Sequence, residues 1–328
     1  MKEKIPASEW LFDVEKAPLF ASVTDREGNT RKVSASSRIA IVATGTDHVV
    51  GIVNKSYRLF TNREALDLSR EFCLEAFPDT SDSEWEFRAA HGPASRSWVA
   101  MDLFHRSCAI NFGGGLATED FTPFVRVTNS YNTSRAVRLD VGFMRGMCSN
   151  GMIFSAEVAK ILASHTDEGI RHLKLSQPFG SMAKLIEEFS ETVAKVRAVE
   201  VTPDEGAEIA RRVIGWPVLP GDPTERQREE QRDLDADLEV RRDRYFRELG
   251  TNAYAAFNLV TDFASHPPEN RRMRRDRPNL ERRAGEWLRD FKRAASQPGF
   301  TIPGHLKELA GRQGAATVAT PRFRGTPA

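Results

Sequence analysis

Hydrophobic and polar residues alternate most regularly in two neighbouring segments near the middle of the chain. In 135–143 an apolar residue occupies every second position from Val137 to Phe143, so these side chains share one face of an extended strand. The segment 124–129 is also strand-like, and a short polar connection separates the two segments. We therefore expect an antiparallel pair of strands with one buried face and one face exposed to water.

Shorter apolar runs predict further strands in the first part of the chain. The runs 39–43 and 48–53 flank the tetrapeptide 44–47, in which a glycine and an aspartate suit a tight reversal. A β-hairpin is expected there. The segment 98–104 is a further predicted strand, because it is a short run of mainly apolar residues.

One helix is predicted within this strand-rich part, over 61–77. Thr61 can accept a hydrogen bond from the amide of Glu64 while the Glu64 carboxylate reaches back, which is the reciprocal arrangement that opens a helix. Apolar residues then recur at helical spacing as far as Pro78, which cannot continue the helix.

From about Ser155 the apolar spacing becomes that of helices, with examples over 156–164 and 182–199. The stretch 224–248 carries mostly charges of both signs, which is typical of a solvent-exposed helix, and we interpret it as an insertion. The sequence thus predicts an α+β protein. Its expected parts are an antiparallel sheet-rich region with one helix over 1–154, a helical region packed on it over 155–310, and a flexible tail over 311–328.

Composition and charge narrow the class of protein. The 47 basic and 46 acidic side chains leave a net charge of +1, which excludes a polybasic, histone-like protein. With 40% hydrophobic residues the chain can build a sizeable core. No apolar stretch is long enough to span a bilayer, and the start of the chain does not resemble a signal peptide. We therefore expect a cytoplasmic protein that is not associated with a membrane.

The sequence offers few groups for catalysis or for a cofactor. Three widely separated cysteines indicate neither a disulfide framework nor a zinc site, and the scattered histidines form no metal-binding motif. The glycine triplet 113–115 lacks the lysine that a phosphate-binding P-loop needs. No metal ion, other cofactor or catalytic residue is therefore predicted.

Two groups of residues nevertheless keep an enzymatic function open. Asp262 and His266 lie four residues apart on a predicted helix and could serve as a general base and the group that orients it. A capping role for His266 is favoured, since a proline follows it and cationic side chains are common at helix ends. Cys148, in a predicted turn, could be a nucleophile, but the sequence assigns no base to its thiol.

The first candidates for ligand binding are basic residues on the expected wet face of the sheet. Guanidinium groups there could contact phosphates, and an adjacent tyrosine could stack against a base. The alternative is an ordinary solvated face that is balanced by Asp140. The candidate residues on the strands and in the connecting loop are Arg126, Asn129, Tyr131, Asn132, Arg135, Arg138 and Arg145.

A second candidate is a cluster of five arginines within 271–277, after a predicted helix that ends at a proline. With one acidic residue among them, these side chains are typical of a patch that binds a polyanion. The alternative is a charged helix surface that is balanced by the acidic residues of 281–290. The residues expected to contact nucleic acid are Arg271, Arg272, Arg274 and Arg275.

A family resemblance rests on four segments in the order of the chain. They are Asn54-Lys55-Ser56-Tyr57-Arg58 with Asn62-Arg63-Glu64, then Arg145 to Met152, then Thr251 to Asn258, and finally Thr261 to His266. Together these segments resemble a family of phage- and plasmid-like proteins that is known as a domain of unknown function. The resemblance spans about residue 10 to about residue 295, and the charged stretch 224–248 departs from the family's pattern.

The resemblance implies a phage or another mobile element, and the strand-rich front with a helical back is loosely similar to single-strand annealing proteins of the RecT and Erf kind. This similarity implies a protein that binds single-stranded DNA or another nucleic acid, forms homo-oligomers, and assists recombination or replication. The alternatives are an enzyme that processes nucleotides or nucleic acid, and an interaction protein without its own ligand. An enzyme requires Asp262, His266 and Cys148 to converge on one pocket, whereas a binding protein requires a continuous basic groove.

Overall fold

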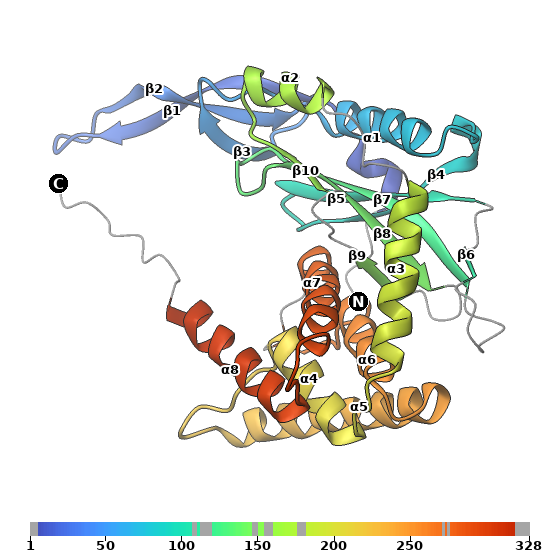
Figure 1. Ribbon diagram of the computed structural model, residues 1–328. Coiled ribbons are helices and arrows are strands. Elements are labelled where there is room, and N and C mark those ends of the chain that lie inside the picture. The colour runs from blue at the N-terminus through green and yellow to red at the C-terminus, as the bar shows by residue number, and fades with distance from the viewer. Residues whose placement is uncertain are drawn as a thin grey trace. The chain divides into compact units, whose positions relative to one another are not determined.

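The computed structural model describes residues 6–106, 110–111, 120–145, 150–153, 160–175, 182–270, 273 and 276–318. The chain divides into two compact units. Unit 1 comprises Met1–Asn111, Asp120–Met144 and Phe154–Ile186, and unit 2 comprises Phe112–Glu119, Arg145–Ile153 and Glu187–Ala328. Strands dominate unit 1 and helices dominate unit 2 (Figure 1). The predicted α+β class is therefore confirmed.

The first sheet of unit 1 is antiparallel, with the strand order β1 (Val14–Thr24), β2 (Thr30–Ala43) and β3 (Val49–Asn54). The hairpin predicted around 44–47 is confirmed as the connection between β2 and β3. Because β1 and β2 are longer than β3, their distal parts pair only with each other and extend as a two-stranded structure (Figure 1). We refer to β1 and β2 together as the ribbon.

The larger sheet of unit 1 has the strand order β10 (Lys160–Ala163), β8 (Val137–Arg145), β7 (Asp120–Ser130), β5 (Trp98–His105) and β4 (Trp85–His91), with the short β6 (Ile110–Asn111) beside β7. β7 and β8 contain the two alternating segments, and they are neighbours as predicted. The helix predicted over 156–164 is wrong for 160–163, because these four residues form β10 and pair with β8. Strand pairing in the folded chain here overrides the local helical spacing.

The expectation of a wet face on this sheet is wrong for β7 and β8. Every residue of β7 from Pro123 to Ser130 is buried, and β8 is buried or half-buried along its length. Helix α1 (Asn62–Ala76) packs against β5 and β7, and polar side chains such as Arg126 and Asp102 pair with each other across the strands. The alternation therefore separates polar from apolar residues without separating exposed from buried ones.

Helix α1 begins where the sequence predicts. The Thr61 side chain accepts from the backbone N–H of Glu64 at 3.1 Å, and the Glu64 carboxylate accepts from the backbone N–H of Thr61 at 2.7 Å. Unit 1 also contains α2 (Asp167–Leu175) and the short 3-10 helices η1 (Ala7–Trp10) and η2 (Asp82–Glu84). The predicted helix over 61–77 is thus confirmed with its cap.

In unit 2, α6 (Ala253–Ser265) is the central helix, and each of its residues is buried. α4 (Pro203–Ile214), α5 (Glu225–Leu249) and α7 (Arg277–Ala295) pack around it, and β9 (Asn150–Ile153) packs against α6 and α7. The charged stretch forms α5, which is anchored by the buried residues Leu234, Leu238, Tyr245 and Phe246. The described helices also include α3 (Met182–Arg197) and α8 (Ile302–Val318).

The structure describes the first part of the predicted flexible tail over 311–328, whose flexibility stays a prediction. Helix α8 continues to Val318, so 311–318 are helical, and 319–328 lie outside the described residues. The N–H groups of this segment find carbonyl partners within the helix, which the small and polar composition did not indicate. Across the described residues, each helix is too short or too polar to cross a bilayer.

Candidate nucleic-acid interface

Arg126, in the middle of the predicted phosphate-binding face, is buried and committed to an ion pair. It lies directly opposite Asp102 in the register of β5 and β7, and its Nε and Nη2 donate to the two carboxylate oxygens at 2.5 and 2.6 Å. Burial alone would raise the pKa of Asp102, but the Arg126 guanidinium and the nearby His91 hold it well below its usual range. Because only 2% of the Arg126 side chain is exposed, this guanidinium is shielded from an approaching phosphate.

Two further predicted arginines of β8 are also engaged within the protein. Arg138 donates through Nε to both carboxylate oxygens of Asp140, at 2.7 and 2.6 Å. Asp140 therefore binds this arginine directly instead of only balancing the charge of the face. Arg145 is buried, and its Nη1 donates to the side-chain oxygen of Asn258 at 3.3 Å. Neither arginine lies on a solvated sheet face.

The loop between β7 and β8 holds the predicted residues that are nearest to solvent. Arg135 and Asn132 are half-buried. The guanidinium carbon of Arg135 lies 3.7 Å from the centre of the Trp98 ring, which is a cation–π contact. The Asn132 side-chain oxygen accepts from the backbone N–H of Ser134 at 3.1 Å, so Asn132 shapes its own turn. These two residues alone do not make a groove.

Asn129 and Tyr131 belong to a buried polar cluster. The Asn129 amide nitrogen donates to the Phe60 carbonyl at 2.8 Å and to the Asn62 side-chain oxygen at 2.9 Å. Because the other atom of the Asn129 amide is then an acceptor, His165 donates to it through Nε2 at 2.9 Å. The Tyr131 hydroxyl accepts from the backbone N–H of Asn62 at 3.0 Å. Tyr131 is only 1% exposed, so its ring is not available to stack on a base.

The cluster continues to Tyr57 and is neutral. The Tyr57 hydroxyl donates to the Ser130 carbonyl at 2.6 Å, and the Tyr57 ring stacks on His165 with the ring centres 4.9 Å apart. Burial raises the pKa of Tyr57 and Tyr131 and lowers the pKa of His165 to about 4. The cluster therefore joins the segments after β3, at the end of β7 and before α2 without carrying charge. Sequence reasoning missed His165, although the resemblance segment 54–64 points to Tyr57.

Several predicted residues lie outside the described part of the chain. These are Arg271, Arg272, Arg274, Arg275 and Cys148. Within the arginine cluster Met273 is buried, and Asp276 caps α7 by accepting from the backbone N–H of Asn279 at 3.4 Å. Nucleic-acid binding by the four arginines and a catalytic role of Cys148 stay predictions.

Asp262 and His266 meet at the end of α6, as their spacing predicts. His266 is the C-terminal cap residue of α6, and its Nδ1 lies 3.1 Å from the Asp262 carboxylate. Arg244 donates to the same carboxylate at 2.7 Å, and Arg241 lies 3.6 Å from it. Burial raises the pKa of Asp262, but His266 and the two arginines outweigh this effect, so the pKa stays below its ordinary value. A carboxylate that is held by three basic partners is a poor general base.

Exposed basic residues are found on the ribbon. β2 carries Arg31, Lys32 and Arg38 and has no acidic residue, and all three basic side chains are exposed. Within the part of the chain that the structure describes, none of the three forms an ion pair or a side-chain hydrogen bond. Their charges are therefore available to an anionic ligand, unlike the charges on the larger sheet.

The ribbon also exposes an aromatic ring beside these cations. Phe20 on β1 is 53% exposed. The register of β1 and β2 places Phe20 and Lys32 on one face of the ribbon and places Arg31 and Val23 on the other face. One face thus combines a cation with an exposed aromatic ring, as in proteins that bind single-stranded nucleic acid, and the other face combines a cation with exposed aliphatic surface.

Among the described residues, no three His, Cys, Asp or Glu side chains come together as metal ligands.

Comparison with known proteins assigns the chain to a family. Residues 49–287 match the family described as a domain of unknown function, DUF932, so the chain belongs to that family. The match begins at β3 and ends within α7, so the ribbon precedes it. Neither the curated proteins nor the solved structures yielded a match to the chain.

Proposed function

We propose that the protein binds single-stranded nucleic acid through the ribbon. The observation that carries the proposal is the three exposed basic side chains on β2, of which Lys32 shares a face of the ribbon with the exposed ring of Phe20. Cations of this kind attract phosphates whatever the base sequence, and an exposed ring can stack on any base. The ribbon therefore binds the ligand without a strong sequence preference.

The exposure of both faces supports a ligand that lies along the ribbon. A two-stranded ribbon is marginally stable in water by itself, and Phe20, Val23 and Val33 leave apolar surface on it. A single strand offers phosphates to the cations and unstacked bases to the apolar surface. A double helix offers its phosphates but presents only base edges in its grooves. The surface of the ribbon therefore suits a single strand better.

The proposed setting is a phage, a plasmid or a similar mobile element, where the protein acts as a homo-oligomer in recombination or replication. The resemblance of four sequence segments to phage- and plasmid-like proteins supports this setting. The looser similarity to annealing proteins of the RecT and Erf kind supports a role in pairing two strands. Annealing needs phosphates to be held while most bases stay accessible, and cations along β2 meet the first requirement.

The test is fluorescence anisotropy of a labelled oligothymidylate with the full chain, over about 50 to 200 mM salt. Replacing Arg31, Lys32 and Arg38 together by Ala should weaken binding strongly at low salt. The plot of log affinity against log salt should also lose about 2 from its slope, since each phosphate contact on a single strand contributes about 0.7.

A matched control removes the same charge from α5. Arg226, Arg228 and Arg232 are exposed there and form ion pairs with neighbouring glutamates, so their joint replacement by Ala should leave binding unchanged. The proposal is wrong if the wild type does not bind at about 50 mM salt. It is also wrong if the two triple variants lose affinity equally.

A further inference from the structure

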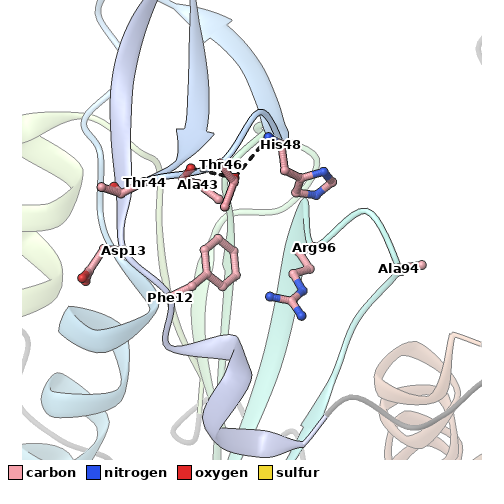
Figure 2. Close-up of a pocket in the computed structure, with 8 residues that line it drawn as sticks. All are labelled: Phe12, Asp13, Ala43, Thr44, Thr46, His48, Ala94 and Arg96. Atoms are coloured by element: carbon pink, nitrogen blue, oxygen red, sulfur yellow. Dashed lines mark hydrogen bonds between the residues drawn. The ribbon is translucent and has the colours of Figure 1, made fainter.

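A pocket lies at the root of the ribbon, where β1 begins and β2 ends. Its volume is about 480 Å³, within the range of small-ligand pockets. The residues before β1, the turn between β2 and β3, and the connection between β4 and β5 form its walls. Figure 2 shows the Phe12 ring, the His48 ring and the Arg96 guanidinium around the same space, while Asp13 and Ala94 point away from the Phe12 ring. The pocket thus combines an aromatic wall with two nitrogen-bearing side chains.

His48 supplies a defined hydrogen-bond acceptor at this pocket. Its Nε2 lies 3.1 Å from the Ser95 carbonyl oxygen, and because a carbonyl oxygen can only accept, Nε2 carries the proton. When the ring is uncharged, Nδ1 is therefore an acceptor. The Thr46 hydroxyl is already committed, since it donates to the Ala43 carbonyl at 2.8 Å and accepts from the backbone N–H of His48 at 3.1 Å.

Arg96 supplies hydrogen-bond donors and a flat cationic surface. Its Nη1 and Nη2 each donate to Glu9, at 3.4 and 3.1 Å, and its Cζ lies 5.4 Å from the centre of the Phe12 ring. A guanidinium has five N–H groups, so donors remain for a ligand after these two contacts. The Arg96 backbone has a φ of 52°, a conformation that costs free energy in residues other than glycine and that clusters at ligand sites.

We propose that this pocket holds one unpaired nucleobase, an inference that rests on the proposed function. A nucleobase is a flat aromatic ring, and both the Phe12 ring and the Arg96 guanidinium plane are surfaces on which bases stack. The edge of a base carries donors and acceptors together, which complement His48 Nδ1 and the free N–H groups of Arg96. Because the pocket adjoins the end of β2, a strand that is held by the cations of β2 passes close to it.

The base contact is tested with two labelled oligonucleotides of equal length, an oligothymidylate and its abasic counterpart. The wild type should prefer the oligothymidylate. Phe12→Leu should lower the affinity for it by about fivefold or more, because one stacked base contributes about 1–3 kcal/mol. The affinity for the abasic strand should not change, since that strand has no base to stack.

Two further variants show whether a lower affinity of Phe12→Leu reflects the lost base contact or a change in folding. Arg96→Gly should reduce the preference for bases as Phe12→Leu does, and it should keep the fold because glycine adopts a φ of 52° without strain. Phe87→Leu is the matched control, since Phe87 is a half-buried phenylalanine of unit 1 outside the pocket. It should bind both oligonucleotides as the wild type does.

The outcomes separate this inference from the proposed function. If the wild type binds neither oligonucleotide, the proposed function is wrong and the base site is wrong with it. If the wild type binds both equally, or if Phe12→Leu and Phe87→Leu have equal effects, the base site is wrong while binding by the ribbon stands.

Thymidine monophosphate distinguishes the two sources of such a base. If thymidine monophosphate competes with the oligothymidylate for the wild type but not for Phe12→Leu, the pocket binds free nucleotides as well as a strand. Lack of competition, together with a preference for bases that depends on Phe12, would assign it to the polymer. Competition that Phe12→Leu leaves unchanged contradicts the base site.

Discussion

The basic residues of β2 in the ribbon and those of the larger sheet of unit 1 differ in their exposure to water and in their ion pairing. On the larger sheet, Arg126 is buried and Arg138 is half-buried, and both bind carboxylates at 2.5 to 2.7 Å. On the ribbon, Arg31, Lys32 and Arg38 are exposed and pair with no acidic residue in the described part of the chain. A buried guanidinium must be neutralised because it has lost its hydration, whereas an exposed one keeps its water. The basic side chains that an anionic ligand can reach are therefore on the exposed ribbon.

The largest effect is expected when the buried pair of the larger sheet is broken. Asp102→Ala leaves the Arg126 guanidinium buried without its carboxylate, which should lower the free energy of unfolding by about 3–5 kcal/mol. Urea denaturation measures this change. The double variant Asp102→Leu, Arg126→Met removes both charges and should cost much less. A single variant as stable as the wild type would show that the ion pair does not secure the buried guanidinium.

A smaller effect is expected from the neutral cluster at the edge of the same sheet. Burial lowers the pKa of His165 from 6.5 to about 4 in the folded chain. Between about pH 4 and pH 6.5, the unfolded chain therefore binds a proton at His165 that the folded chain does not bind. The stability of the fold is thus highest above about pH 6.5 and falls as the pH is lowered from about 6.5 to 4. The shift corresponds to about 3 kcal/mol.

His165→Gln tests this pH dependence. Glutamine can still donate to the Asn129 side chain, but it does not titrate, so the fall in unfolding free energy between about pH 6.5 and 4 should be shallower than in the wild type. Urea denaturation at a series of pH values gives both slopes. Equal slopes would mean that His165 is not protonated differently in the folded and unfolded chains.

The smallest effect on stability is expected from the ribbon. Replacing Arg31, Lys32 and Arg38 by Ala removes exposed side chains that support no described contact, so the free energy of unfolding should change by less than about 0.5 kcal/mol per residue. The same variant should lose most of its affinity for the oligothymidylate. A destabilisation comparable with that of Asp102→Ala would mean that these residues are structural.

Features that depend on near neighbours in sequence could be predicted. The cap of α1 at Thr61 was predicted correctly, because it depends on residues within a few positions of the helix start. The hairpin between β2 and β3 follows from the residues of its own turn in the same way. The prediction over 156–164 failed at β10, because those residues become a strand by pairing with β8, which lies elsewhere in the sequence.

The candidate site could not be predicted from such local signals. Arg126 and Asp102 are 24 positions apart in sequence and meet only because β5 and β7 pair in one particular register. Asn129 likewise meets Asn62 and His165 from separate segments of unit 1. The alternation of residue types predicts that these side chains share a polar face. It does not say whether water or another protein group forms their hydrogen bonds.

By itself, the sequence determined the α+β class, the positions of several helices and strands, and the cap of α1, since spacing and near neighbours decide these features. Only the tertiary structure decided which basic residues are neutralised and which remain open to a ligand. That distinction depends on strand register and burial, which bring together side chains from distant segments of the chain.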